Sequence, residues 1–298
     1  MSEVTAQSVY ATYEVLKARV TQPVPSDYVR FRAGKEIIGC VKKTLAMKLA
    51  GATSDFRLMD SLYLTDENCS SVTARTAAMQ KAARILAELG ELPEDVGELV
   101  DVRATVYDGV FCQAPRLLCR KLGLMTTSIR LTAYDKEGRT VLARRRPGKV
   151  IGGGLWDSLA AGLVKASEEP EHALYRELFE EAGLSADDLT VVESARFVQE
   201  MPVPEGYLRE VVRNYEGRLK EGVRFENRDG EVSEFAAFDC QEALRMAEQE
   251  KVMCAAGIGI AETTMTHMGQ RIEEKWLHYK GPDFPKCLAP KSIEYFGR

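Results

Sequence analysis

Hydrophobic and polar positions alternate with different periods along the first part of the chain. Residues 74–90 are rich in Ala and Leu and end at a glycine, so they predict a helix. Residues 114–123 predict a second, shorter helix that stops at Gly123. Residues 99–108 alternate between apolar and polar side chains and predict a strand. This part of the chain is therefore expected to be mixed α and β.

The pattern after Ser128 is dominated by strands. Residues 128–146 contain two alternating runs around a turn at Gly138, which predicts a β-hairpin. Further strands are predicted at 195–201, 208–219 and 230–239, and helices from about residue 241. This order favours an α/β/α or α+β sandwich. We therefore expect an N-terminal α+β accessory domain over residues 1–122 and a second domain, with C-terminal helices, over residues 123–298.

Composition and charge narrow the class of protein. The chain has 298 residues, of which 45% are hydrophobic and 29% charged, and a formal net charge of −5. This mildly acidic balance argues against a nucleic-acid partner held by phosphate neutralisation. No apolar run approaches the ~20 residues of a membrane span, and the N-terminus lacks the pattern of a secretory signal. We expect a cytoplasmic protein with no membrane partner.

Cysteine and histidine residues offer no metal or disulfide framework. The seven cysteines are scattered and none forms a C-x-x-C pair, which argues against a zinc ribbon and against paired disulfides. Three histidines make a histidine-based zinc site improbable. The sequence therefore predicts reduced thiols.

Residues 168–184 are unusually rich in acids, and the preferences of helix ends explain part of this composition. Pro170 suits a first helical turn, and Glu169 and Glu171 suit the positive end of the helix dipole. At the other end, Gly183 suits the left-handed position that ends a helix, with Leu184 packing back. These residues need no function beyond forming the helix.

Three further acids of this helix need another explanation. Glu177, Glu180 and Glu181 stand at positions i, i+3 and i+4, so they share one face, where like charges repel. Arg176 cannot neutralise all three. A hard divalent cation such as Mg²⁺ would, because it takes carboxylate oxygens and completes its shell with water and substrate phosphate. A solvated charged face is the alternative reading.

The spacing around these acids favours the metal site. From Gly162 through Glu168 to the segment 176–184, the chain matches G-x5-E-x7-R-E-U-x-E-E-x-G-U at every fixed position, U being aliphatic. A chance match at ordinary residue frequencies is on the order of one in ten million. The chain therefore resembles the Nudix hydrolases.

The resemblance implies a fold, a reaction and residue roles. It implies a Nudix α/β/α sandwich with a mixed sheet, preceded by the smaller α+β domain, and hydrolysis of a diphosphate with Mg²⁺ or Mn²⁺. Glu177, Glu180 and Glu181 would bind the metal, with Glu177 also the candidate general base and Arg176 orienting it. Three further roles are implied around these acids. Gly162 would let the backbone turn beside the metal, and Glu168 would brace the helix or join the metal shell. Glu231 or Glu234 would complete the metal site, with Glu231 preferred because it follows an Asp-Gly turn.

A looser likeness extends over most of the chain. Segments such as 31–50, 74–93 and 155–164 resemble the Nudix branch related to fungal thiamine pyrophosphokinases. That branch implies thiamine diphosphate, or an analogue, cut to the monophosphate. Substrate selection, homodimer formation and structural support all remain open as roles of residues 1–122.

Residues next to the signature give secondary candidates. Arg144 and Arg145 lie in a basic run that is either solvated or in reach of substrate phosphate. The three glycines at 152–154 lack the spacing of a phosphate-binding fingerprint and predict a flexible loop. Trp156 is expected to pack in the core rather than to stack on a substrate ring.

Several alternative functions stay open. A nucleoside-diphosphate-X hydrolase acting on ADP-ribose, a dinucleotide or a nucleotide sugar would use the same acids. Isoprenoid diphosphate isomerisation is disfavoured because no cysteine lies in the signature loop. A non-catalytic regulator that binds a diphosphate ligand is disfavoured by the intact Arg176, Glu177, Glu180 and Glu181.

Overall fold

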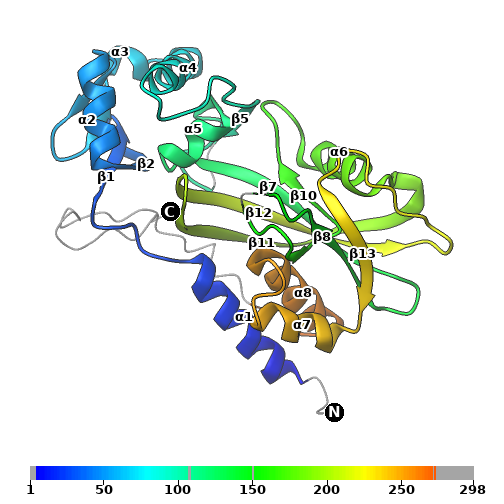
Figure 1. Ribbon diagram of the computed structural model, residues 1–298. Helices are drawn as coiled ribbons and strands as arrows, with labels where there is room; N and C mark the ends of the chain where they lie inside the picture. The colour runs from blue at the N-terminus through cyan, green and yellow to red at the C-terminus, as the bar shows by residue number, and fades with distance from the viewer. Residues whose placement is uncertain (1–4, 107–108, 150, 271, 273–298) are drawn as a thin grey trace.

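A mixed sheet forms the centre of the C-terminal part of the chain (Figure 1). The computed structural model describes residues 5–106, 109–149, 151–270 and 272. The main path of the sheet runs β11–β12–β7–β8–β13, with β10 paired to β7 and β9 paired to β8. The β12–β7 pairing is parallel, and the other pairings in this sheet are antiparallel. The strands are β7 (Met125–Tyr134), β8 (Thr140–Arg145), β9 (Trp156–Asp157), β10 (Ala160–Leu163), β11 (Leu189–Val203), β12 (Gly206–Leu219) and β13 (Val232–Phe238).

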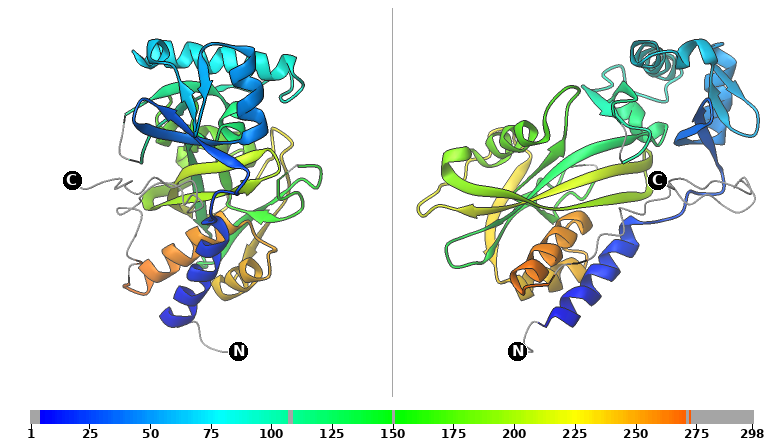
Figure 2. Two further views of the ribbon diagram at one scale, coloured as in Figure 1. Left: turned by 90° about the vertical axis from the view of Figure 1, so that its left-hand side faces the viewer. Right: turned by 180° about the vertical axis from the view of Figure 1, so that it is seen from behind.

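Helices cover both faces of this sheet (Figures 1 and 2). Helix α6 (Pro170–Ala182) packs Leu174 and Leu178 with Leu131 of β7 on one face. On the other face, α1 (Ala6–Val20), α7 (Cys240–Glu248) and α8 (Cys254–His267) share a second core with apolar side chains of β8, β11 and β12. A short 3₁₀ turn, η1 (Ala186–Asp188), links α6 to β11. The architecture is thus the expected α/β/α sandwich.

The position of α1 was not anticipated, because the boundary at residue 122 assigned these residues to the accessory domain. Val9, Tyr13, Leu16 and Val20 are buried in the same core as α7 and α8. The approach of α1 to α8 is close, since a Cβ at Gly257 would lie 2.8 Å from Leu16 Cδ1. The first helix therefore completes the second layer of the sandwich.

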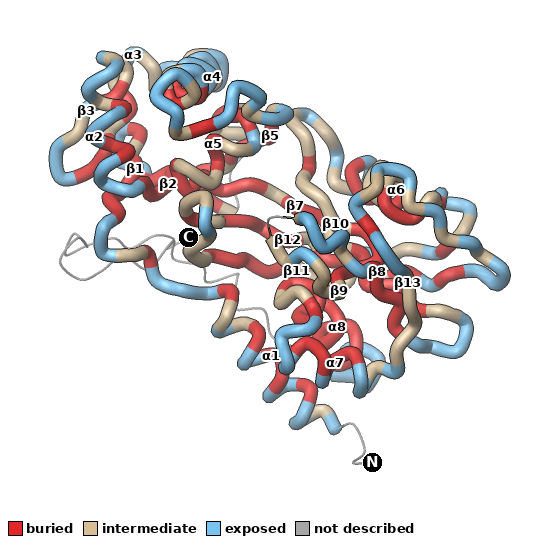
Figure 3. Tube along the Cα trace, viewed as in Figure 1, coloured by how far each residue is buried: buried red, intermediate tan, exposed pale blue. Residues whose placement is uncertain are grey.

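Residues after α1 build a separate α+β unit with its own core, which spans Val29 to Leu124. A four-stranded sheet runs in the order β2–β1–β4–β3, and β5 pairs with β6 in a hairpin. Figure 3 shows the outer surface of α4 exposed and the strands beneath it buried. The elements are β1 (Tyr28–Ala33), β2 (Glu36–Lys42), α2 (Lys43–Ala52), β3 (Phe56–Leu58), β4 (Leu62–Leu64), α3 (Asp66–Cys69), α4 (Val72–Glu88), β5 (Leu99–Val102), β6 (Cys112–Pro115) and α5 (Arg116–Lys121).

The strand predicted over residues 99–108 is shorter than expected. It ends at Val102, and Arg103 instead pairs with Met125 at the start of β7, to whose carbonyl it donates its N–H over 3.0 Å. Residues 107 and 108 lie outside the described part of the chain, as do Cys287 and His278.

A buried arginine joins the two units. Arg209 of β12 is 2% exposed, and its Nε donates to Glu200 over 2.9 Å. Its Nη1 donates to the carbonyls of Ile38 and Gly123, at 3.2 and 3.3 Å. The charge is therefore paired and its donors are used, as burial of a guanidinium requires.

Candidate active site

Helix α6 carries the predicted acids on the side facing β10. It begins at Pro170, and it ends where Gly183 takes φ 69°, the left-handed conformation that favours glycine. Leu174 and Leu178 are buried and fix the rotation of the helix about its axis. That rotation leaves Glu181 buried, Glu177 largely buried and Glu180 partly exposed.

Arg176 connects three of the predicted carboxylates. Its Nε and Nη2 donate to the two oxygens of Glu168 over 2.8 and 2.9 Å, a bidentate pair. Its Nη1 donates to Glu177 over 2.6 Å and to Glu180 over 3.3 Å. Burial raises the pKa of Glu168, but the hydrogen bonds from Arg176 and from the Lys165 N–H outweigh it and hold the pKa below its ordinary value. Glu168 is therefore a charged anchor for Arg176.

Glu177 lies directly against the backbone of β10. A Cβ at Gly162 would lie 2.0 Å from Glu177 Oε1 and 2.1 Å from Cδ, so only glycine leaves room for this carboxylate. Burial raises the pKa of Glu177 above its ordinary value, although the positive charge of Arg176 opposes the shift. Gly162 therefore shapes the site by leaving space for Glu177.

Glu181 is the most deeply buried acid of the helix, 5% exposed. The Ala161 N–H donates to its Oε2 over 2.9 Å. Burial, followed by the negative charge of Glu177, raises the pKa of Glu181 to about 8. A carboxyl group in this state is stabilised in its charged form when a cation binds beside it.

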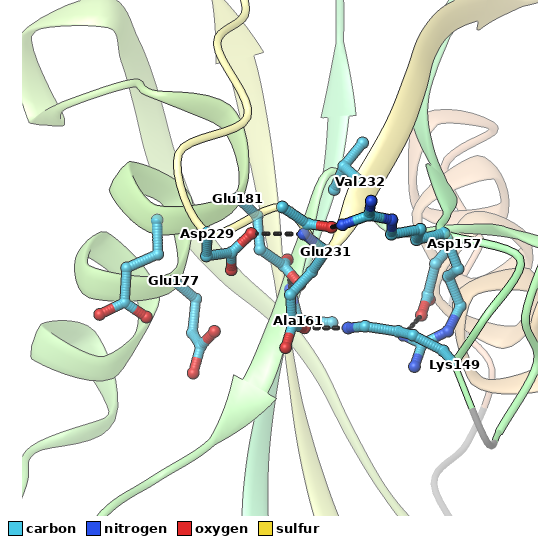
Figure 4. A network of polar contacts seen from close by, with 12 residues as sticks. Lys149, Asp157, Ala161, Glu177, Glu181, Asp229, Glu231 and Val232 are labelled. Carbon is cyan, nitrogen blue, oxygen red and sulfur yellow. Dashed lines mark hydrogen bonds and ion pairs between the residues drawn. The ribbon is translucent and has the colours of Figure 1, made fainter.

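Two acids from the loop before β13 join Glu181 (Figure 4). Carboxylate oxygens of Glu181, Asp229 and Glu231 all lie within 4.8 Å of one another. The loop is attached to the end of α6, because the N–H groups of Arg228 and Asp229 donate to the Glu180 carbonyl, at 3.0 and 3.2 Å. These three residues can hold a cation between the helix and the loop.

Asp229 was missed by the sequence analysis, which considered Glu231 and Glu234. The expected turn is present: Gly230 has φ 79°, and the Glu231 N–H donates to Asp229 Oδ1 over 2.7 Å. Glu234 is the third residue of β13; its side chain is 51% exposed and pairs with Arg144 over 3.2 Å. An Asp-Gly turn beside a candidate ligand was the signal that could have found Asp229.

Basic residues of the loop after β8 lie beside the acids. The side chain of Lys149 forms an ion pair with Glu231, and Figure 4 shows it reaching toward Glu181. Burial, followed by the charge of Arg145, lowers the pKa of Lys149. The glycines at 152–154 make a compact turn, in which Cβ atoms at Gly152 and Gly153 would collide with Met253 and with the Pro147 carbonyl.

The two predicted phosphate-binding arginines lie on opposite sides of β8. Arg145 donates to the buried Asp157 over 2.9 Å, and Arg130 of β7 bonds to the other oxygen of the same carboxylate. Arg144 pairs with Glu234 and lies over the ring of Trp156, 5.8 Å from its centroid. Trp156 packs edge-on against Phe238 and against the core shared with α8, the packing role expected for it.

An α/β/α sandwich with an acidic helix beside a glycine-containing strand defines the class of protein expected from the signature. Residues 126–255 match the family model of the NUDIX domain. Over these residues the chain is similar to the Nudix family, and the α/β/α sandwich is the fold that this similarity implies. The match is to the domain as a whole, and the thiamine pyrophosphokinase branch stays a prediction.

Two curated proteins are similar in sequence to part of the chain. Over 88 residues the chain is 32% identical to an uncharacterized Nudix hydrolase of Pseudomonas aeruginosa, covering 30% of this chain and 51% of that protein. Over 82 residues it is 32% identical to an RNA pyrophosphohydrolase of Proteus mirabilis, covering 28% and 43%. The chain thus spans about half the length of the curated relatives it matches.

Solved structures match a larger part of this chain than the sequence relatives do. A MutT protein from Methanosarcina mazei has a TM-score of 0.39 and 18% identity, over 49% of this chain and 96% of that chain. A C. elegans Ap4A hydrolase has a TM-score of 0.40 and 17% identity, over 48% and 98%. Within the described residues, no helix is long and apolar enough to cross a membrane.

Proposed function

We propose that this chain is a divalent-metal-dependent pyrophosphohydrolase that uses one water to cleave a small-molecule diphosphate into a monophosphate and phosphate. The observation that carries the proposal is the convergence of Glu181, Asp229 and Glu231 within 4.8 Å, beside the Arg176-bound Glu177. Glu181 is buried while Asp229 and Glu231 are exposed, so the three carboxylates meet at the edge of the site, where a hard cation that takes oxygen ligands can reach them.

The donor set fits Mg²⁺ or Mn²⁺, since every candidate ligand is a carboxylate. Glu177, Glu180, Glu181 and Glu231 are the predicted ligands, and the geometry adds Asp229. When bound, the cation would lower the pKa of water and screen the diphosphate charge.

The protein's own groups would bind, orient and collect the proton. Glu177 is proposed to accept the proton of the attacking water, because its burial raises its pKa and so its basicity. Arg176, anchored by Glu168, fixes the orientation of Glu177. Lys149 and Arg145 lie beside the acids and are proposed to contact the substrate phosphates. Arg144, whose guanidinium pairs with Glu234, is likewise proposed to contact the substrate phosphates.

Thiamine diphosphate or an analogue is the proposed substrate, on the whole-chain resemblance alone. A nucleoside-diphosphate-X compound is the second candidate, favoured by the relative named RNA pyrophosphohydrolase. A homodimer is proposed as the oligomeric state and can be checked by light scattering.

The test is a substrate panel. Purified protein with Mg²⁺ is incubated with thiamine diphosphate, ADP-ribose, a dinucleoside polyphosphate and a nucleotide sugar, and products are identified by mass. Release of a monophosphate from a panel member is expected, and the preferred member identifies the leaving group. Tight binding without product would support the diphosphate-binding regulator instead, and neither binding nor product would overturn both.

A further inference from the structure

The accessory unit is in direct contact with the loop that leads into α6. Val100 of β5 forms an antiparallel bridge with Lys165, and the Ala166 N–H donates to the Leu99 carbonyl over 2.9 Å. The β5–β6 hairpin therefore adds a backbone pairing to the loop between β10 and α6. This loop carries Glu168, the anchor of Arg176.

Ser167, at the tip of the loop, adopts a conformation that is unfavourable for its residue type. Its φ is 62°, in the left-handed region that is unfavourable for a residue with a Cβ. Side chains of the accessory unit hold it there. Asp101 Oδ2 accepts the Ser167 N–H over 3.1 Å, and Gln113 Nε2 donates to both Asp101 Oδ1 and Ser167 Oγ, at 3.0 and 3.1 Å.

A short series of contacts connects the hydrogen bonds at Ser167 to Glu177, the proposed base. Ser167 precedes Glu168, whose carboxylate accepts the Lys165 N–H over 2.9 Å and so closes the loop on itself. Glu168 holds Arg176 through two hydrogen bonds, and Arg176 donates to Glu177 over 2.6 Å. A change in the conformation of Ser167 would therefore displace Glu168 and, through Arg176, the carboxylate of Glu177.

We propose that Asp101, supported by Gln113, is a positioning residue for the Nudix site: by holding Ser167 in its left-handed conformation, the accessory unit sets the orientation of Glu177. The part of this inference that concerns turnover rests on the proposed function. The part that concerns the contact between Asp101 and Ser167 does not, because that contact can be measured on the protein without substrate.

The experiment uses the full chain and two paired substitutions. Asp101→Ala removes the acceptor, and Ser167→Gly removes the conformational cost that the acceptor offsets, because glycine adopts positive φ freely. Asp95→Ala is the matched control: Asp95 also accepts a backbone N–H, that of Gly97 over 2.9 Å, but this bond lies within the accessory unit. Hydrogen exchange of residues 164–168, Mn²⁺ affinity, kcat and KM are measured for each variant and for the double variant.

For Asp101→Ala we expect faster exchange in the loop, weaker Mn²⁺ binding and a kcat lowered about 10- to 100-fold with KM little changed, since small misplacements of a catalytic group cost this much. The double variant is expected to recover most of the loss, and Asp95→Ala to match wild type. Unchanged exchange in Asp101→Ala, or a loss that Ser167→Gly does not restore, would overturn the inference. If the wild type hydrolyses no member of the panel, the proposed function fails. Hydrogen exchange and Mn²⁺ affinity still test whether Asp101 holds Ser167 in its conformation.

Discussion

The carboxylate of Glu177 occupies the space that the Cβ of any side chain at position 162 would need. The three atoms nearest to a Cβ built on Gly162 all belong to the Glu177 side chain, at 2.0, 2.1 and 2.7 Å. Strand β10 and helix α6 therefore pack closely at the Glu177 carboxylate, the group proposed to accept the proton.

Gly162→Ala is therefore expected to displace Glu177 while the fold persists, because the new methyl group meets a side chain rather than backbone. We expect kcat to fall about 100-fold or more, in line with the cost of a misplaced catalytic group. Steady-state kinetics and circular dichroism measure the two effects. In a Glu177→Ala background, Gly162→Ala should add little further loss, and a full additive loss would contradict this explanation.

Substitution of the acids of α6 tests the metal ligands. Glu181→Gln and Glu180→Gln are each expected to lower turnover by orders of magnitude and to weaken Mn²⁺ binding, because an amide oxygen carries no charge for the cation. Glu171→Gln, the same change on an exposed residue of the same helix, should leave both unchanged. Wild-type rates in both site variants would refute the assignment.

Stability of the metal-free protein should depend on pH in a defined direction. Burial raises the pKa of Glu181 to about 8 from 4.5, so between these values the unfolded chain has released a proton that the folded chain retains. The contribution of Glu181 is thus fully present below about pH 4.5 and is lost as the pH rises toward 8. Urea unfolding at several pH values should show this fall and a flatter profile in Glu181→Gln. A steeper fall in the variant would contradict the shift.

Lys149 is expected to compete with the metal, because its ammonium group pairs with Glu231. Lys149→Met should tighten Mn²⁺ binding roughly 3- to 10-fold, the effect of removing one partly screened positive charge, and should raise KM if the lysine contacts phosphate. Isothermal titration measures the affinity. Lys149→Arg keeps the charge and should bind Mn²⁺ like wild type; equal affinities in all three proteins would exclude competition.

Sequence periodicity and spacing predicted the sandwich and the acidic helix, because both depend on local patterns. The alternation of β7 and β8 and the caps of α6 are encoded within a few residues of each element. The resemblance of residues 126–255 to the Nudix family is likewise supported by the match to the family model. The residue roles within the site remain predictions.

Contacts between segments that are distant in the chain could not be predicted from local sequence patterns. Asp229 reaches Glu181 because backbone groups of its loop bond to the end of α6, an arrangement that no local pattern encodes. Asp101 meets Ser167 across 66 residues. The composition of α1 gave no sign that its apolar face packs on α8 rather than on the accessory unit.

That packing has a consequence for how the chain folds. The partners of α1 in α8 begin at Cys254, so during synthesis the apolar face of α1 is not covered until α8 has been made. The unit from Val29 to Leu124 can assemble earlier, because its core is made of neighbouring segments. A fragment that begins at residue 123 would keep the acidic helix α6, but without α1 part of the apolar surface of α8 would be exposed to solvent. Helix α1 therefore closes the sandwich only after α8, far along the chain, has been made.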